Sequence, residues 1–237
     1  MDMPVIVEIV GESKAQAFET VFDYFHWVDN TFSTFKSASE ISKINDGRLP
    51  VSRASREMLE IFRLAEQTKR ETDGFFDITR HGKLDPSGIV KGWAIHNAAL
   101  LIKKMGHNDY YVEVGGDIEV SGHNADGKPW TIGIRNPFAI HEIVKIVHLI
   151  NHGIATSGTY ERGKHIYNPK TQKPAGEIAS ITVIGPNVYE ADRFATAAFA
   201  MGNEGIRFIG KRRGLEGYMI DTGGIATFTD GFEAYTI

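Results

Sequence analysis

The stretch Tyr189-Glu190-Ala191-Asp192-Arg193-Phe194-Ala195-Thr196-Ala197-Ala198-Phe199-Ala200-Met201 predicts the helix around which the rest of the chain is organised. Alanine and methionine are good helix formers, and neither proline nor glycine interrupts the run. A buried stripe can form along one side of this helix from Phe194, Ala195, Ala198 and Phe199. Asp192 and Thr196 are one helical turn apart and therefore lie one above the other on the same side.

The pair of Asp192 and Thr196 brings a carboxylate and a hydroxyl side by side. Two hard oxygen donors one turn apart suit Mg²⁺, which takes one or two carboxylates and fills its other positions with water and substrate phosphate. The same spacing is also typical of a solvated helix face or of a side-chain hydrogen bond. The helix alone does not distinguish a Mg²⁺ site from a solvated face or a side-chain hydrogen bond. The remaining chain has to distinguish them.

The length and composition of the chain indicate that it can fold on its own. With 237 residues, of which 42% are hydrophobic, it can bury a real core. We expect residues 1–237 to form one domain, or two small intertwined subdomains. The formal charge of −4 and the absence of a basic run longer than Lys211-Arg212-Arg213 argue against a nucleic-acid-binding surface. Because the chain has no cysteine, disulfides, thiolate catalysis and Fe–S clusters are excluded.

The first residues carry no targeting signal. A strand-like run occupies residues 4–10, and no basic segment followed by a long apolar one precedes it. As given, the sequence is therefore expected to be soluble, cytoplasmic and without membrane insertion. A leader removed from an exported protein would leave the same pattern, so an exported native form stays open.

Amphipathic helices are predicted over residues 14–31 and 52–70 and from Gly88 to about residue 105, with a short one near 203–212. The first stripe consists of Phe18, Val21, Phe22, Phe25, Val28 and Phe32. The second consists of Met58, Ile61, Phe62 and Ala65, and the third of Val90, Ala94, Ala98, Leu101 and Met105. We expect these stripes to form core rather than a cofactor-binding surface.

Strands are predicted where apolar residues alternate between turn signals. A Gly-Gly break at Gly115-Gly116 divides residues 110–120 into two strands, or marks a bulge that admits something close to the backbone. Further strands are predicted over residues 130–134, 143–150, 154–160 and 178–184, with a terminal hairpin over 215–221 and 225–228. Because strands and helices do not alternate regularly, the sequence favours an α+β fold with mixed or antiparallel sheets and packed helices.

The segment Leu84-Asp85-Pro86-Ser87-Gly88-Ile89-Val90-Lys91-Gly92 leads into the third predicted helix. A Ser-Gly turn at a helix N-terminus can cradle a phosphate, because free N–H groups and the positive end of the helix dipole point there. The segment is not a P-loop, since the spacing Gly-x-x-x-x-Gly-Lys-Ser/Thr is absent. Taken alone, this signal is weak.

Several separated marks follow one another in an order that resembles a known family. They are Met3-Pro4-Val5, residues 32–45 with Ser39-Glu40-Ile41-Ser42, Gly74-Phe75-Phe76-Asp77-Ile78-Thr79, Asp85 to Gly92, Val114-Gly115-Gly116-Asp117, Ala155-Thr156-Ser157-Gly158, residues 165–169, and Ala191-Asp192 to Thr196. Together they resemble the FAD:protein FMN transferases, the ApbE family, over nearly the whole chain. The resemblance implies an ApbE-like domain that cleaves the pyrophosphate of FAD and attaches FMN, through a phosphoester, to a Thr or Ser of another protein, with release of AMP.

The resemblance also implies a role for individual residues. Mg²⁺ would be held by Asp192, Thr196 and the backbone carbonyl of Val90, and His165 would be the catalytic histidine, as base or as orienter. The resemblance also implies that FAD is contacted by Met3, Phe35, Gly74, Phe75, Phe76, Asp77, Asp85, Gly88 and Lys91. Asp77 and Asp117 are equally typical of turn-forming carboxylates. Asn168 stands where the family commonly has Asp, which removes a negative charge and keeps a hydrogen-bonding shape.

Three functions stay open at this stage. The leading hypothesis is a flavin transferase whose acceptor protein carries the motif Asp-x-x-Ser/Thr-Gly-Ala-Ser/Thr. That motif is absent here, since Ser157-Gly158-Thr159 lacks the alanine and the upstream aspartate, so self-modification is not expected. The alternatives are a hydrolase that gives FMN and AMP when water replaces the hydroxyl, and a carrier that binds FAD without turnover.

Overall fold

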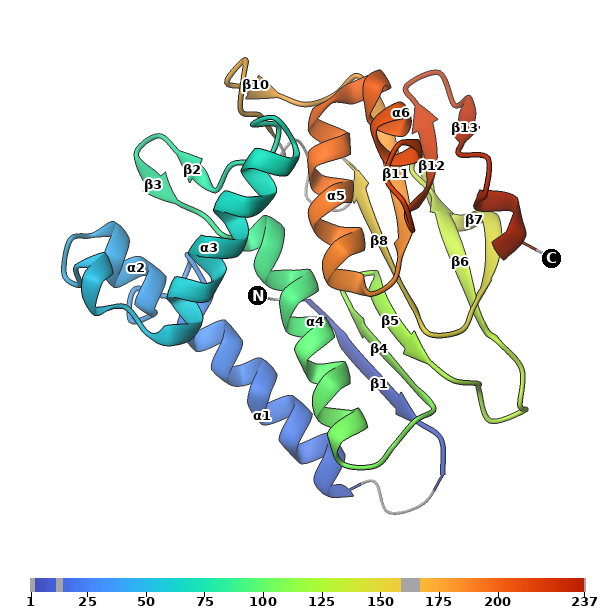
Figure 1. The fold of residues 1–237 in the computed structure, drawn as a ribbon, viewed down its shortest axis with the longest axis horizontal. Coiled ribbons are helices and arrows are strands. Elements are labelled where there is room, and N and C mark those ends of the chain that lie inside the picture. Colours follow the sequence, from blue (N-terminus) through green and yellow to red (C-terminus); the bar gives the residue numbers. More distant parts are fainter. Residues whose placement is uncertain (1–2, 12–14, 159–166, 237) are drawn as a thin grey trace.

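The computed structural model describes residues 3–11, 15–158 and 167–236. Its centre is a seven-stranded sheet with the strand order β1-β4-β5-β8-β11-β12-β13 (Figure 1). These strands are β1 (Val5–Ile9), β4 (Tyr110–Val114), β5 (Asp117–Ser121), β8 (His152–Gly158), β11 (Ile178–Gly185), β12 (Glu216–Asp221) and β13 (Ala226–Phe228). Every pairing in this sheet is antiparallel, which confirms the α+β prediction.

Three two-stranded ribbons accompany the sheet. They are β2 (Thr79–Arg80) with β3 (Lys83–Leu84), β9 (Tyr167–Asn168) with β10 (Lys173–Pro174), and β6 (Trp130–Asn136) with β7 (Ala139–Leu149). The β6–β7 ribbon is the longest of the three and leaves the sheet between β5 and β8.

The helices are α1 (Ala15–Phe32), α2 (Glu40–Asn45), α3 (Arg56–Glu71), α4 (Ser87–Lys104), α5 (Val188–Ala200) and α6 (Gly205–Gly210), with short 3₁₀ turns at Val51–Arg53, Gly202–Glu204 and Phe232–Tyr235. In Figure 1, α4 and α5 lie side by side on one face of the sheet. No described helix combines the length and the apolarity that a membrane crossing requires.

Two apolar cores lie on the two faces of the sheet. The helix-side core joins α1, α3, α4 and α5 to inward-facing strand residues such as Val112 and Ile181, whereas the second core joins Ile118 and Ile154 to the β6–β7 ribbon. Alternate residues of one strand therefore enter different cores. This explains why β11 is buried at every position although its sequence alternates.

The helices follow the predicted patterns with two exceptions. Helix α5 begins one residue before the predicted start, and its stripe residues Phe194, Ala195, Ala198 and Phe199 are all buried. The assignment of Phe22 to the α1 stripe is wrong: Phe22 is 39% exposed, because it lies next to Val21 and falls outside the arc of α1 that meets the core. Met105 is likewise exposed, since it caps the end of α4.

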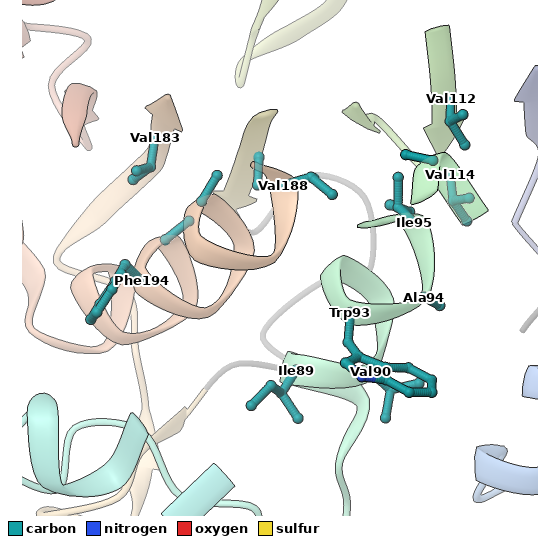
Figure 2. Packing of buried hydrophobic residues seen from close by; sticks show 14 of the residues in the cluster. Ile89, Val90, Trp93, Ala94, Ile95, Val112, Val114, Val183, Val188 and Phe194 are labelled. Atoms are coloured by element: carbon teal, nitrogen blue, oxygen red, sulfur yellow. The ribbon is translucent and has the colours of Figure 1, made fainter. Parts of the chain in front are cut away.

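Helices α4 and α5 touch at a glycine. Figure 2 shows Val188 and Phe194 of α5 together with Ile89, Val90 and Trp93 of α4 among the buried side chains. A Cβ atom on Gly92 would lie 2.7 Å from Asp192 Cβ and 2.9 Å from the Val188 carbonyl oxygen. The absence of a side chain at Gly92 therefore sets how closely the two helices approach.

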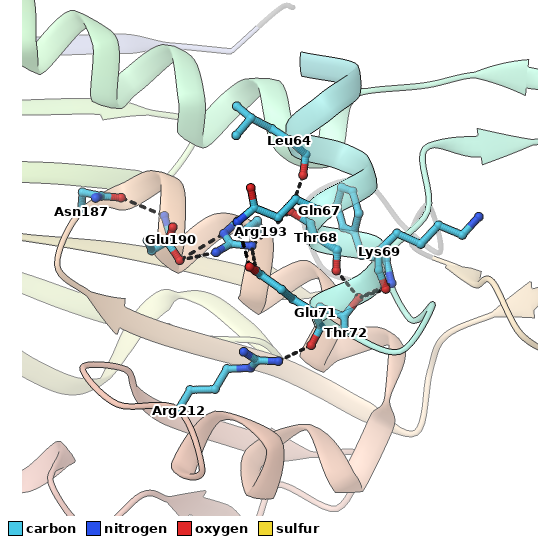
Figure 3. Close-up of polar contacts among 11 residues, drawn as sticks. Leu64, Gln67, Thr68, Lys69, Glu71, Thr72, Asn187, Glu190, Arg193 and Arg212 are labelled. Carbon is cyan, nitrogen blue, oxygen red and sulfur yellow. Dashed lines mark hydrogen bonds and ion pairs between the residues drawn. The ribbon is translucent and has the colours of Figure 1, made fainter. Parts of the chain in front are cut away.

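A charged network joins α5 to α3 (Figure 3). The Arg193 side chain is only 5% exposed, pairs with Glu71 and with Glu190 at 2.6 Å, and donates to the Thr68 hydroxyl at 3.2 Å. Arg212 approaches from the other side and donates to the backbone carbonyl of Glu71. The guanidinium of Arg193 thus has carboxylate partners on two helices.

Arg193→Met is expected to lower the free energy of unfolding by about 1–2 kcal/mol. Breaking a buried ion pair is costly, but the cost is moderate here because the two glutamates that remain are partly exposed to solvent. Arg207→Met is the matched control, since Arg207 forms the same kind of pair with Glu204 one turn earlier but is 74% exposed. The control should change stability by less than about 0.5 kcal/mol. Urea unfolding of both variants checks this prediction, and equal losses would contradict it.

Candidate active site

One pocket gathers the sequence-predicted site residues. It lies where the start of α4, the side of α5 that carries Asp192 and Thr196, the β4–β5 turn and the end of β8 meet. Every described candidate except Gly74 lines it: Met3, Phe35, Phe75, Phe76, Asp77, Asp85, Gly88, Val90, Lys91, Asp192 and Thr196. Residues from distant parts of the sequence therefore share one surface.

Helix α5 supplies a carboxylate and a hydroxyl to this pocket. Asp192 is only 3% exposed, so it does not belong to a solvated face. Its Oδ2 atom accepts a hydrogen bond from the Gly92 backbone N–H at 2.8 Å, which makes α4 the element that orients the carboxylate. Thr196 stands one turn further along α5 and lines the same pocket. A Cβ atom on Gly88 would lie 3.3 Å from Thr196 Cγ2, so the first turn of α4 is held against this pair as well.

The buried carboxylates of Asp192 and Asp117 share the ammonium group of Lys91. Lys91 Nζ lies 2.7 Å from Asp117 Oδ2 and 3.8 Å from Asp192 Oδ1. Asp117 is 1% exposed, and its Oδ1 atom accepts from the Thr156 N–H at 3.1 Å. Burial raises the pKa of the Asp192 carboxyl well above its usual range, the Lys91 ammonium lowers it, and the nearby Asp117 raises it. A further positive charge beside Asp192 would offset this unfavourable burial of negative charge.

Aromatic and sulfur-containing side chains also line the pocket. Phe75 and Phe76 follow the end of α3, and Lys170 Nζ lies 4.2 Å from the centroid of the Phe75 ring. Met3 packs over Gly115, where a Cβ atom would lie 2.6 Å from its sulfur. Phe35 lines the pocket although it is 94% exposed, so its ring has a free face toward the opening.

A sequence model of the ApbE family matches residues 1–82 and 79–219 of the chain. The chain belongs to the ApbE family. Among curated proteins, the FAD:protein FMN transferase of Haemophilus influenzae is 33% identical over 167 residues, which cover 65% of this chain and 48% of that protein. The chain thus spans about half the length of this curated relative.

Solved structures of the family share the fold. The flavin transferase ApbE from Vibrio cholerae superposes with a TM-score of 0.86 and 22% sequence identity, covering 99% of this chain and 96% of the other. The ApbE protein from Thermotoga maritima gives a TM-score of 0.88 at the same identity and coverage. The fold prediction and the family resemblance are therefore both confirmed.

Several lining residues of this ApbE chain escaped the sequence analysis. Arg80 and Tyr167 form one side of the pocket, with the guanidinium carbon 4.7 Å from the ring centroid. The Tyr167 hydroxyl donates to the Thr79 carbonyl at 2.7 Å, which ties the β9 segment to β2. No sequence signal could reveal this pair, because the two residues lie in two-residue strands far apart in the chain.

Asn168 has a structural use that an aspartate at this position could not fulfil. Its amide nitrogen donates to the Ala200 carbonyl at 3.0 Å, at the end of α5, and its oxygen accepts from the Lys170 N–H at 2.9 Å. An ionised aspartate has no donor for the first of these bonds. The amide thus fastens the β9–β10 ribbon to the helix that carries Asp192.

The remaining predicted residues are Asp77, whose carboxylate also forms a turn, Gly74 and His165. Asp77 pairs with Lys69 at 2.6 Å and accepts from the Thr79 N–H at 2.8 Å, so it forms the turn expected of such a carboxylate and also lines the pocket. Gly74 does not line the pocket; it turns the chain after α3 in the left-handed region, with φ of 77°. His165 lies outside the described residues, so its role stays a prediction.

Proposed function

We propose that this protein transfers FMN from FAD to a Ser or Thr hydroxyl of an acceptor protein and releases AMP. The observation that carries the proposal is the pair of Asp192 and Thr196 on the wall of a pocket shared with the α4 N-terminus, in a chain of the ApbE family. Relatives such as the Haemophilus influenzae protein bear the name FAD:protein FMN transferase.

The donor set of the pocket fits Mg²⁺. Among the described residues, no group of three His, Asp or Glu side chains is placed to hold a metal ion. One carboxylate from Asp192, the Thr196 hydroxyl and the Val90 carbonyl leave the remaining octahedral positions to water and phosphate oxygens, which is how Mg²⁺ is commonly held. When bound, the ion would neutralise charge on the pyrophosphate of FAD during phosphoryl transfer.

The chain's own groups would position the two phosphates. Helix α4 begins at Ser87, whose N–H donates to Asp85 Oδ1 at 3.1 Å, while the Ile89 N–H donates to the Pro86 carbonyl at 3.0 Å. In the first turn this leaves the Gly88 N–H as the donor for a phosphate oxygen. Lys91 lies one turn further along α4, between Asp117 and Asp192, and adds a positive charge at the pocket wall. We assign the isoalloxazine and adenine rings to the part of the pocket with Phe35, Phe75 and Met3.

The reaction forms one bond and breaks one. The acceptor hydroxyl oxygen attacks the phosphorus next to riboflavin, and the P–O bond to the AMP phosphate breaks with its electron pair on AMP. The hydroxyl proton passes to His165 if this residue is the base, or to solvent if it only orients the hydroxyl. Positioning and electrostatic neutralisation supply most of the catalysis in such a step.

Incubation with FAD, Mg²⁺ and an acceptor domain that carries the motif Asp-x-x-Ser/Thr-Gly-Ala-Ser/Thr tests the proposal. We expect a covalent fluorescent flavin band on the acceptor, an equal amount of AMP, and loss of both when EDTA removes the metal. AMP without the band would show a hydrolase. Tight FAD binding with neither product would show a carrier, and each of these two outcomes would overturn the transferase.

A further inference from the structure

A second cavity lies between the sheet and the β6–β7 ribbon, and the site described above does not use it. It encloses about 400 Å³ and is lined on the sheet side by Ile118 and Ile154, and on the ribbon side by Ile143 and Ile146. We call it the ribbon cavity. Its walls combine these isoleucines with polar groups from β4, β6 and β8.

The ribbon cavity adjoins the candidate active site. Gly115 and Thr156 line both of them. Gly115 and Gly116 form the β4–β5 turn with φ of 56° and 85°, and the Met3 side chain packs over Gly115. A chain segment that occupies the ribbon cavity therefore reaches the active site beside Thr156, which lines both spaces.

The ribbon side of the cavity carries apolar surface that the chain itself leaves uncovered. Ile143 and Ile146 are 52% and 50% exposed, although both line the cavity. Their neighbours on the ribbon, Phe138 and Ile140, are exposed as well. Exposed apolar side chains that line a cavity are typical of a binding site.

The polar groups of the cavity balance in charge. Glu113 on β4 accepts a hydrogen bond from the Tyr111 hydroxyl, and Arg135 stands on β6 across the cavity. One acidic and one basic side chain do not select a strongly charged ligand. They suit a polypeptide segment, whose backbone offers both donors and acceptors and whose apolar side chain can enter between the isoleucines.

We propose that the ribbon cavity binds the acceptor protein, through an extended segment next to the hydroxyl that receives FMN. This inference rests on the proposed function, because that reaction requires a second protein beside the FAD site. An apolar side chain of the acceptor lies between Ile146 and the sheet, and the following residues pass Thr156 so that the hydroxyl faces the phosphate. The cavity thus sets the direction in which the acceptor enters.

Ile146→Glu tests the inference, with Leu100→Glu as the matched control. Leu100 is 46% exposed on α4, so the control adds the same charge at a similarly exposed aliphatic position outside the cavity. Binding is measured by fluorescence anisotropy of a rhodamine-labelled acceptor domain that carries the motif, without FAD. We expect Ile146→Glu to weaken binding by about tenfold or more, because it removes one buried aliphatic side chain from the interface. Leu100→Glu should bind like the wild type.

Two further measurements keep the outcomes distinct. Ile143→Glu should repeat the effect of Ile146→Glu, and unfolding temperatures close to wild type exclude misfolding as the cause. No acceptor binding by the wild type, or equal binding by Ile146→Glu and Leu100→Glu, would overturn the inference. So would a dimer that only Ile146→Glu dissociates, since a second copy of the chain would then cover the cavity. Failure of flavin transfer in the preceding assay, with acceptor binding intact, would overturn the proposed reaction and leave this binding result standing.

Discussion

Asp192→Asn is expected to reduce the rate of AMP release from FAD by at least about 10²–10³-fold, because the pocket loses the only charged oxygen among the three proposed metal donors. The asparagine oxygen can still accept the Gly92 N–H bond that now orients Asp192, so the packing of α4 against α5 stays intact. Mg²⁺ titrations of AMP release, in the presence of the acceptor domain, measure the effect. The dependence on Mg²⁺ should shift to higher concentrations as well.

The same variant should be at least as stable as the wild type in the absence of Mg²⁺. Burial raises the pKa of the Asp192 carboxyl, the Lys91 ammonium lowers it, and Asp117 raises it. At neutral pH the carboxyl is ionised in the unfolded chain, so burying it without a bound metal opposes folding. A group with a raised folded-state pKa stabilises the protein at low pH, and this stabilisation is lost as the pH rises through that pKa. Asparagine removes this penalty. Unchanged AMP release by Asp192→Asn would refute the metal assignment, whereas reduced activity together with a lower unfolding temperature would indicate a structural role.

Gly92→Ala is expected to lower the free energy of unfolding by about 1–2 kcal/mol and to abolish most of the flavin transfer. The added Cβ atom would lie 2.7 Å from Asp192 Cβ and 3.0 Å from Asp192 Oδ2, so α4 and α5 have to separate. Overpacking of this kind costs about 1–3 kcal/mol, of which the better helix propensity of alanine returns about 1 kcal/mol at most. The displaced carboxylate accounts for the loss of transfer.

Gly176→Ala is the control for this substitution. A Cβ atom on Gly176 would meet nothing within 4 Å, so its stability should stay within about 0.5 kcal/mol of the wild type. Urea unfolding and flavin fluorescence of the acceptor are measured for both variants. Wild-type behaviour of Gly92→Ala would mean that the contact between α4 and α5 does not hold Asp192 in place.

The parts of the site that depend on local spacing could be predicted from the sequence. Asp192 and Thr196 share a side of α5 because helical geometry fixes residues one turn apart, and the start of α4 at Ser87 follows from the Ser-Gly turn. Their burial could not be predicted in this way. Asp192 became buried only because Gly92, far away in the sequence, lets α4 approach.

Pairs that form between distant elements had no signal in the sequence. The ion pair of Lys91 and Asp117 depends on the position of α4 over the β4–β5 turn, and the contact of Arg80 with Tyr167 joins two short ribbons. The exposure of Phe22 has the same origin, since periodicity predicts an apolar face but not how wide an arc of it the neighbouring elements cover. Only tertiary packing decides these features.

The position of β1 has a consequence for how the protein emerges from the ribosome. Among the described strands, β1 hydrogen-bonds only to β4, with Val5 opposite Val114, so its partner is synthesised long after it. At typical synthesis rates that interval lasts roughly 5–20 s, far longer than the formation of a local hairpin. During this time the apolar side of β1 has no sheet to join, and chaperone binding to nascent chains should therefore be concentrated on the segment that precedes β4.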